Sequence, residues 1–159
     1  MNVVFLDYDG VVNTAMWDDN GIDCRFNFPS DNKVNNFQAV QWVSEFCERY
    51  NYDIVVTSTW RVYDNYIECL RNGGLRGGIA VLGRTPEIHG GTRGDEVMAY
   101  LQEHTEIDNF IIFDDYSDMG CLSDHLILCD TRVGFGMPEF YKALELHTRM
   151  QLEKERTKF

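Results

Sequence analysis

Two aspartates spaced one residue apart follow the first apolar run of the chain. Residues 3–6 read Val-Val-Phe-Leu, and Asp7 and Asp9 come next in the stretch DYDG, which Gly10 closes. An unbroken apolar run of this length is typical of a strand buried on both faces of a parallel sheet. Carboxylates at the end of such a strand are polar groups of a kind that phosphoryl transfer can use. Asp and Gly are also common turn residues, so DYDG alone does not separate a reactive site from a turn.

Polar side chains also end two later apolar runs. Residues 53–58, Asp-Ile-Val-Val-Thr-Ser, predict a strand that runs into the hydroxyls of Thr57 and Ser58. Residues 110–113 predict another strand, which an acidic pair at 114–115 follows. Because ligands bind beyond the carboxyl ends of strands in parallel sheets, we expect these groups and the DYDG acids to meet at one edge.

Four carboxylates at one edge of a sheet repel one another, so that some must be protonated or a cation must join them. The four are Asp7, Asp9, Asp114 and Asp115. They offer oxygen ligands with no His or Cys nearby, which favours a hard cation. Mg²⁺ is the ion we expect.

The remaining pattern predicts a single α/β domain over residues 1–159, with a mainly parallel sheet flanked by helices. Apolar residues recur every three to four positions from Val34 to Tyr50, which predicts a helix with Ser30 and Asp31 as its N-cap. The other elements expected are helices at 63–71, 95–104, 117–122 and about 138–156, and strands at 79–82 and 125–129.

The overall charge is −12, which argues against a polyanionic partner, but its distribution is uneven. Residues 61–93 hold five arginines against three acids, so this segment is able to meet an anion. Five scattered cysteines form no CxxC or Cys/His cluster, and no apolar run approaches the ~20 residues of a membrane helix. Because the predicted first strand begins almost at Met1, we also expect no removable leader. We therefore expect a cytoplasmic protein without a membrane partner; no pattern indicates its oligomeric state.

Four stretches resemble, in order and spacing, the sequential motifs of the haloacid dehalogenase (HAD) superfamily of aspartyl-phosphate phosphohydrolases. They are FLDYDGVVN, VVTSTWR, GTRGDEV and FIIFDD, and the resemblance spans roughly residues 3–118. The pattern is especially similar to small HAD domains of nucleic-acid repair proteins, including the 3′-phosphatase half of bacteriophage polynucleotide kinase-phosphatases. The resemblance implies a Rossmann-like HAD domain.

The resemblance also implies catalytic roles. Asp7 would attack phosphorus and form an aspartyl-phosphate, and Asp9 would protonate the leaving oxygen and then activate water. Gly10 would allow the turn that presents both acids to the substrate. Thr57, or its neighbour Ser58, would donate a hydrogen bond to the transferring phosphoryl group.

Mg²⁺ would bind Asp7, the main-chain carbonyl of Asp9 and Asp115, with Asp114 supporting it. The superfamily also places a lysine in its third motif, but this chain has no lysine between positions 33 and 142. Arg93 is the expected substitute, because arginine binds phosphate bidentately. Arg61 and Arg84 are less favoured substitutes for this lysine. We expect both arginines, together with Gly10, to lie at the substrate-binding site.

A full cap domain is not expected, because only about 46 residues separate Gly10 from Thr57 and the predicted helix uses many of them. A short flap at about 13–30 remains, which leaves the site open to large substrates. Its aromatic residues Trp17, Phe26 and Phe28 would either stack on a base or pack the flap onto the domain.

These observations predict a Mg²⁺-dependent phosphatase acting on a phosphate at a nucleotide or polynucleotide end. The alternatives are a phosphatase of another small phosphomonoester or of a phosphoprotein, and a catalytically idle HAD-like binding or regulatory domain. A receiver-type domain, which accepts phosphate as a signal, is disfavoured because its acidic pair comes early and its phosphoacceptor in the middle of the chain.

Overall fold

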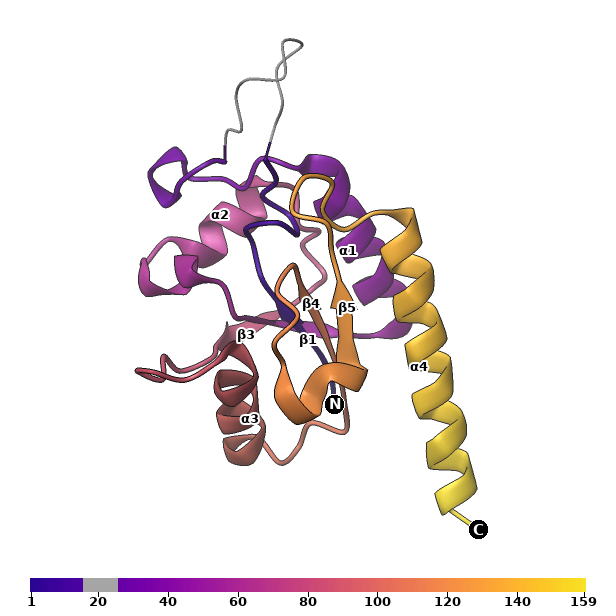
Figure 1. Cartoon of the computed structure of the whole chain (residues 1–159). Helices are drawn as coiled ribbons and strands as arrows, with labels where there is room; N and C mark the ends of the chain where they lie inside the picture. Colours follow the sequence, from indigo (N-terminus) through magenta and orange to yellow (C-terminus); the bar gives the residue numbers. More distant parts are fainter. Residues whose placement is uncertain (16–25) are drawn as a thin grey trace.

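The sheet places β1 at its centre. The computed structural model describes residues 1–15 and 26–159, and its five strands are all parallel, in the order β3-β2-β1-β4-β5 (Figure 1). The strands are β1 (Asn2–Leu6), β2 (Asp53–Val56), β3 (Val81–Arg84), β4 (Asn109–Asp114) and β5 (Leu126–Leu128). The α/β class and the parallel sheet expected from the alternating pattern are confirmed.

The register brings the three polar strand ends to the same level. Leu6 is paired with Val56 of β2 on one side and with Phe113 of β4 on the other. The next residue of β1, Asp7, donates its main-chain N–H to the Phe113 carbonyl at 3.0 Å, and the N–H of Thr57 donates to the Leu6 carbonyl at 2.9 Å. The chain therefore passes from buried strand to polar side chains at one edge of the sheet.

Helices cover both faces of the sheet. The larger core lies on the face with α1 (Phe37–Tyr50), α2 (Tyr66–Asn72) and α4 (Met137–Thr157), and the smaller one lies against α3 (Arg93–Glu103) and the 3-10 helix η3 (Gly120–His125). Along β1, β2 and β4, successive side chains point alternately into the larger and the smaller core, as the geometry of a strand requires. Those of the larger core are Val4, Leu6, Ile54, Val56, Ile111 and Phe113, and those of the smaller core are Val3, Phe5, Val55 and Ile112.

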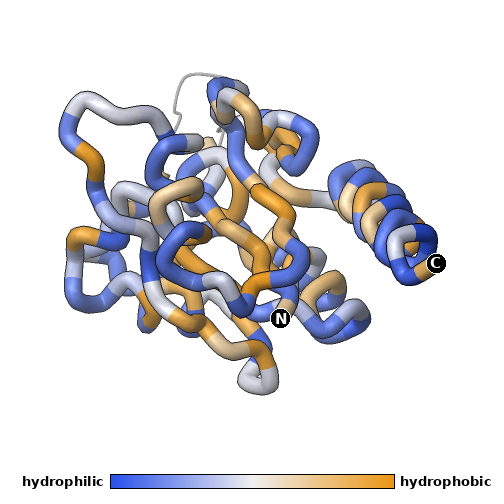
Figure 2. Tube along the Cα trace, turned by 90° about the horizontal axis from the view of Figure 1, so that it is seen from below, coloured by the Kyte–Doolittle hydropathy of each residue, from blue (hydrophilic) through white to orange (hydrophobic). Residues whose placement is uncertain are grey.

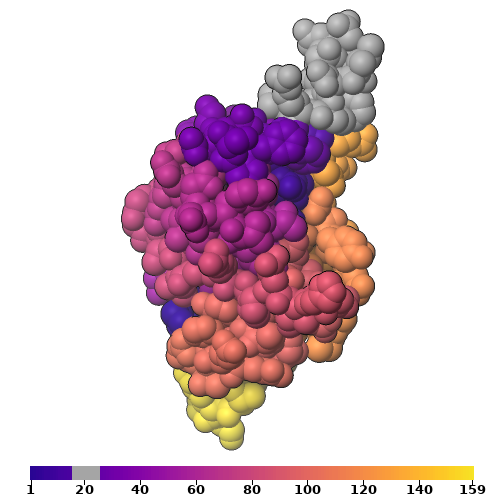
Figure 3. Space-filling model, turned by 90° about the vertical axis from the view of Figure 1, so that its left-hand side faces the viewer, coloured from indigo at the N-terminus to yellow at the C-terminus, as the bar shows by residue number. Residues whose placement is uncertain are grey.

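The distribution of hydropathy follows these layers. Hydrophobic segments run through the middle of the molecule, whereas the long helix α4 alternates between hydrophobic and hydrophilic residues (Figure 2). On the face that Figure 3 shows, residues of about 60–105 cover most of the surface, and the first residues of the chain surface only in small areas. Strand β1, which Asp7 follows directly, is buried from Val3 to Leu6.

The expected N-cap of the first helix was wrong. Ser30 and Asp31 belong to the short 3-10 helix η1 (Pro29–Asp31), and α1 begins six residues later with Asn36 as its N-cap. The Asn36 side-chain oxygen accepts a hydrogen bond from the N–H of Ala39 at 3.0 Å. Asn caps helices as well as Ser and Asp do, and several such residues lie together here, so the pattern did not single out the right one.

Other boundaries moved by a few residues. Instead of one helix at 63–71, the 3-10 helix η2 (Thr59–Val62) precedes α2, and β3 begins two residues later than the predicted 79–82 strand. The C-terminal helix α4 extends one residue beyond the predicted range at each end. Among the described residues, no helix is long and apolar enough to cross a membrane.

The segment expected as a flap is described only in part. Residues 16–25, with Trp17, lie outside the described residues. Of the other two aromatics, Phe26 is half-buried, whereas Phe28 is 66% exposed and so does not pack its ring into the domain.

Candidate active site

Three carboxylates meet at the carboxyl ends of β1 and β4. Asp7, Asp114 and Asp115 each offer one oxygen atom, and these atoms lie within 4.8 Å of one another. Asp7 and Asp114 are buried, and Asp115 is half-buried. The strand register thus brings together three of the four acids that the sequence predicted to meet, the exception being the side chain of Asp9.

Gly10 makes room for one of these acids. Its φ angle is +81°, and a Cβ atom built at Gly10 would come within 2.2 Å of Asp115 Oδ2. The same oxygen accepts a hydrogen bond from the Thr131 hydroxyl at 2.8 Å. Gly10 therefore allows both the turn after β1 and the approach of Asp115, and Thr131 fixes where that carboxylate points.

The Asp9 side chain lies outside the three-carboxylate cluster and has its own partners. Its Oδ1 accepts hydrogen bonds from Asn13 Nδ2 at 2.7 Å and from the Trp60 indole N–H at 3.1 Å. Asn13 is fully buried and is itself held in place: its side-chain nitrogen also donates to the Asn27 carbonyl, and its side-chain oxygen accepts from the N–H of Asn35. Asp9 is thus oriented separately from Asp7, as two different roles would require.

The two candidate hydroxyls after β2 differ in what they bind. Ser58 is the N-cap of η2, and its Oγ accepts a hydrogen bond from the N–H of Trp60 at 3.3 Å. Thr57 Oγ1 is buried and has no hydrogen-bond partner among the described residues. Since buried hydroxyls rarely stay unpaired, Thr57 is the better placed of the two to bind a ligand.

Arg93 is the first residue of α3 and reaches the acidic cluster. Its Nε lies 3.4 Å from Asp114 Oδ2, and its Nη2 lies 3.9 Å from Asp7 Oδ1. Its Nη1 is buried without a hydrogen-bond partner among the described residues. A cation at the N-terminus of a helix interacts unfavourably with the helix dipole, so Arg93 does not stabilise α3 from this position. Binding of an anion explains its position better.

The start of α3 is closely fixed. Thr92 and Asp95 form a capping box, with hydrogen bonds of 3.2 Å and 2.8 Å. A Cβ atom on Gly94 would come within 2.6 Å of the Met119 carbonyl oxygen. This close packing holds the base of the Arg93 side chain against the segment that follows β4.

Arg61 is buried and engaged by the protein. Its Nη1 donates to the carbonyls of Thr57 at 2.6 Å and Ser58 at 3.0 Å, and its Nε donates to the Thr85 carbonyl at 3.1 Å. Its Nη2 forms an ion pair with Glu96 Oε1 at 2.8 Å, and both side chains are largely buried. Arg61 therefore ties the end of β2 to the helix that carries Arg93.

Arg84 lies at the surface and contacts the same region. It donates to the main-chain carbonyl of Arg61, and its guanidinium carbon lies 5.5 Å from the centre of the Tyr66 ring. Neither arginine forms an ion pair with the three carboxylates, so within the described residues Arg93 is the cation that contacts them.

Burial and mutual repulsion disfavour the charged forms of the acids at this site. Burial, and next the neighbouring Asp114 carboxylate, raise the pKa of Asp7 well above its usual value, although Arg93 opposes them. Burial also raises the pKa of Asp114 to about 6 against the opposing effect of Arg93. For Asp9, burial raises the pKa, while the hydrogen bonds from Asn13 and Trp60 lower it. The Arg93 guanidinium, which is the cation that contacts these acids within the described residues, does not balance their charge.

The donor set fits a hard divalent cation. It consists of carboxylate oxygens alone, close enough to share one ion, and one of them, Asp114 Oδ2, is buried without a hydrogen-bond partner in the described residues. Mg²⁺ and Ca²⁺ prefer such oxygen ligands. A cation would also offset the repulsion that raises these pKa values.

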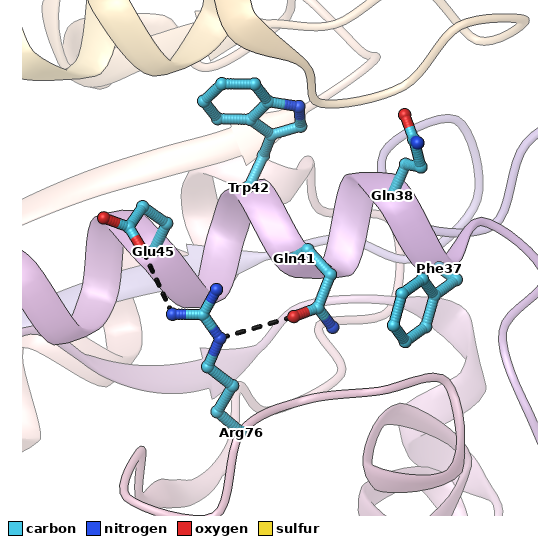
Figure 4. Close-up of a pocket in the computed structure, with 6 residues that line it drawn as sticks. All are labelled: Phe37, Gln38, Gln41, Trp42, Glu45 and Arg76. Carbon is cyan, nitrogen blue, oxygen red and sulfur yellow. Dashed lines mark hydrogen bonds and ion pairs between the residues drawn. The ribbon is translucent and has the colours of Figure 1, made fainter.

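A hollow opens beside Arg93. It has a volume of about 330 Å³, and Thr59, Thr92, Glu87 and Tyr116 are among its lining residues. The Tyr116 side chain is 57% exposed, while its main-chain N–H donates to Asp114 Oδ1 at 2.9 Å. Figure 4 shows another hollow, on α1 beside Arg76, to which none of the site acids contributes.

One family comparison decides what kind of domain this is. The family described as the HAD domain in Swiss Army Knife RNA repair proteins matches residues 3–140. The chain belongs to this family. The match confirms the superfamily resemblance of the four motifs, and the small parallel-sheet fold of this HAD domain agrees with it. A comparison with curated proteins finds no match.

Three polar residues of the site were missing from the sequence prediction. Asn13, Trp60 and Thr131 orient the carboxylates of Asp9 and Asp115. Asn13 and Trp60 stand inside the motifs FLDYDGVVN and VVTSTWR, so their position was a usable signal. Thr131 comes from the loop after β5, and nothing in its local sequence linked it to the acids.

Proposed function

We propose that this HAD domain is a Mg²⁺-dependent phosphatase that forms an aspartyl-phosphate on Asp7. The observation that carries the proposal is the buried cluster of Asp7, Asp114 and Asp115 with Arg93 against it. The separately oriented Asp9 beside this cluster supports it further. An idle binding domain would have no need for an acid held apart from the metal-binding group.

Asp7 is the proposed nucleophile. Its main-chain N–H is fixed to β4, and one of its carboxylate oxygens accepts a hydrogen bond from the Tyr8 N–H at 2.8 Å. The other oxygen is then available to attack phosphorus in line. Arg93 and the unpaired Thr57 hydroxyl would bind the phosphoryl oxygens, which carry the charge in the transition state.

Asp9 is the proposed general acid and base. Burial raises its pKa, which is the direction that a group donating a proton to a leaving oxygen needs. After the leaving group departs, the resulting carboxylate would take a proton from the water that hydrolyses the aspartyl-phosphate.

The carboxylates of Asp7, Asp114 and Asp115, with the main-chain carbonyl of Asp9, would hold Mg²⁺. When bound, the ion neutralises phosphate charge so that an anionic nucleophile is able to approach. Gly10 and Thr131 support this set by admitting and orienting Asp115.

The proposed substrate is a phosphate at a nucleotide or polynucleotide end. The family description, which names RNA repair proteins, supports this class. So does the hollow of about 330 Å³ beside Arg93, where the exposed Tyr116 ring offers a surface on which a base could stack. We assign Arg61 to positioning rather than substrate contact, because its donors are already bound by protein groups.

A phosphatase screen with and without Mg²⁺ tests the proposal. The substrates are RNA and DNA oligonucleotides with 3′- or 5′-phosphate, mononucleotides, sugar phosphates and a phosphopeptide. We expect Mg²⁺-dependent release of phosphate, fastest from a nucleotide or oligonucleotide. A preference for sugar phosphates or the phosphopeptide would contradict the substrate class, and no release from any of them would favour an idle binding domain.

A further inference from the structure

Both side-chain hydrogen bonds to the Asp9 carboxyl end on the same oxygen. Asn13 Nδ2 lies 2.7 Å and Trp60 Nε1 lies 3.1 Å from Asp9 Oδ1. Each of these groups is an N–H donor, so Oδ1 acts as a double acceptor. Within the described residues, no hydrogen bond to Asp9 Oδ2 accompanies them.

This arrangement distinguishes the two oxygens of the carboxyl. An oxygen that accepts two N–H hydrogen bonds is poorly placed to carry the proton, so a protonated Asp9 carries it on Oδ2. We propose that Trp60 is a positioning residue, whose indole N–H, together with Asn13, orients Asp9 so that Oδ2 transfers the proton to the leaving oxygen. The inference rests on the proposed phosphatase function.

Trp60 is well fixed for such a role. Its side chain is 3% exposed, and its main-chain N–H donates to the Ser58 hydroxyl that caps η2. Its ring meets the Tyr8 ring edge to face, with centroids 5.6 Å apart, and the Tyr8 hydroxyl donates to the Tyr66 carbonyl at 2.7 Å. The indole therefore has little freedom to turn away from Asp9.

Burial alone does not account for this contact. A buried indole needs a partner for its N–H, but any main-chain carbonyl would serve. Here the partner is instead the half-buried carboxyl of the proposed general acid, 51 positions away in the sequence. A second donor, Asn13, is held on the same oxygen by its own buried contacts.

The proton transfer is balanced as follows. An oxygen of Asp7 forms a bond to phosphorus, and the bond from phosphorus to the leaving oxygen breaks with its electron pair on that oxygen. The leaving oxygen takes the proton from Asp9 Oδ2 and departs as an alcohol, while Asp9 becomes a carboxylate. In the second step Asp9 takes a proton from water, whose oxygen binds phosphorus, and the Asp7 carboxylate and inorganic phosphate are released.

Leaving-group chemistry tests the role of Trp60. An alkoxide, such as a ribose oxygen, needs a proton to depart, whereas p-nitrophenolate departs readily without one. The Trp60→Phe variant retains an aromatic ring for the contact with Tyr8 but lacks the N–H. The values of kcat/KM are compared for a nucleoside monophosphate and for p-nitrophenyl phosphate, because kcat/KM reports the step that releases the leaving group.

We expect Trp60→Phe to lower kcat/KM for the nucleoside monophosphate by about tenfold or more, which is part of the roughly 10²- to 10⁴-fold that a general acid contributes. The value for p-nitrophenyl phosphate should change by less than about threefold, since its departure does not depend on the acid. Trp42→Phe, which changes a tryptophan that packs on Phe140 away from the acids, should leave both values close to those of the unchanged protein.

An equal fall for both substrates would overturn the inference, because a general loss of site structure does not depend on the leaving group. Unchanged values for both would overturn it as well. If Trp60→Phe does not fold, replacing the indole with benzothiophene removes the N–H while keeping the two-ring shape, and the same comparison applies. If the unchanged protein hydrolyses only an oligonucleotide phosphate, that substrate replaces the nucleoside monophosphate in the comparison, and failure to hydrolyse any of them would instead refute the proposed function on which the inference rests.

Discussion

Arg93 and Asp114 form, among the described residues, the closest contact between a cation and the acidic cluster, with Nε of the arginine 3.4 Å from Oδ2 of the aspartate. Neither that carboxylate oxygen nor Arg93 Nη1 has a hydrogen-bond partner in the described part of the chain. The two side chains attract each other by charge, yet the arginine keeps an N–H group that is able to donate to a ligand, and the aspartate keeps an oxygen that is able to bind a metal ion. In an ion pair with a purely structural role, we would expect these two groups to be hydrogen-bonded to each other.

Replacing Arg93 with alanine should remove a donor to the transferring phosphoryl group. We expect kcat/KM for the best substrate to fall by about 10²- to 10³-fold, as for the loss of one preorganised donor to a charged transition state. Steady-state kinetics with Mg²⁺ measure this. Arg49→Ala is the matched control, because Arg49 is exposed and pairs with Glu45 on its own helix. Equal, small effects of both substitutions would move the phosphate-binding role away from Arg93.

The metal-free protein should lose stability as the pH rises from about 4 to above 6. Asp7 and Asp114 have raised pKa values in the folded state, that of Asp114 at about 6, so the folded protein binds protons more tightly than the unfolded chain. Their contribution to the free energy of unfolding is therefore complete below the unfolded pKa and is lost as the pH rises through the folded pKa.

Urea denaturation in the presence of a chelator, at pH 5 and pH 7, measures this loss. In Asp114→Asn the difference between the two pH values should shrink, and added Mg²⁺ should stabilise the unchanged protein at pH 7 but stabilise the variant less. The electrostatic account of the site would be wrong if the two proteins showed the same pH dependence.

Gly10→Ala should displace Asp115. The new Cβ atom would overlap Asp115 Oδ2, and the φ angle of +81° adds strain of about 1–2 kcal/mol for a residue with a side chain. We expect a weaker rise of the melting temperature with Mg²⁺ and a lower phosphatase rate. Gly77→Ala serves as the control, since a Cβ atom there meets nothing within 4 Å. A Gly10→Ala protein that binds Mg²⁺ as tightly as the unchanged protein would show that Asp115 is not a ligand.

Arg61→Met should destabilise the fold rather than weaken substrate binding alone. The substitution leaves Glu96 and three main-chain carbonyls without their buried partner, and loss of one member of a buried ion pair typically destabilises by about 3–5 kcal/mol. Chemical denaturation measures the effect, and Glu96→Gln, which retains a hydrogen-bond acceptor for Arg61, should destabilise less. Unchanged stability together with a raised KM would instead indicate that Arg61 contacts the substrate.

The sequence predicted the strands that carry the site because their apolar runs are long and each ends abruptly in polar residues. Parallel pairing of β1 with β2 and β4 then makes the meeting of Asp7 with Asp114 and Asp115 a geometric consequence. The order of the four motifs was specific enough to indicate the family that the comparison then showed.

Contacts between distant segments were not predictable in the same way. Trp60 reaches Asp9 across 51 positions, and Arg61 joins Glu96 across 35, so neither contact leaves a periodic pattern in the sequence. The start of α1 was misplaced because Ser30, Asp31 and Asn36 are all good caps, and only packing selects among them.

Substitution of Asp7 by asparagine tests the central claim most directly. The amide keeps the size of the side chain but does not attack phosphorus, so the folded variant should release no phosphate above background with Mg²⁺ from the substrate that the unchanged protein hydrolyses best. Asp118→Asn is the matched control, because Asp118 is exposed and lies outside the acidic cluster, and it should keep nearly full activity. Mg²⁺-dependent turnover retained by the Asp7→Asn protein would contradict the assignment of Asp7 as the nucleophile.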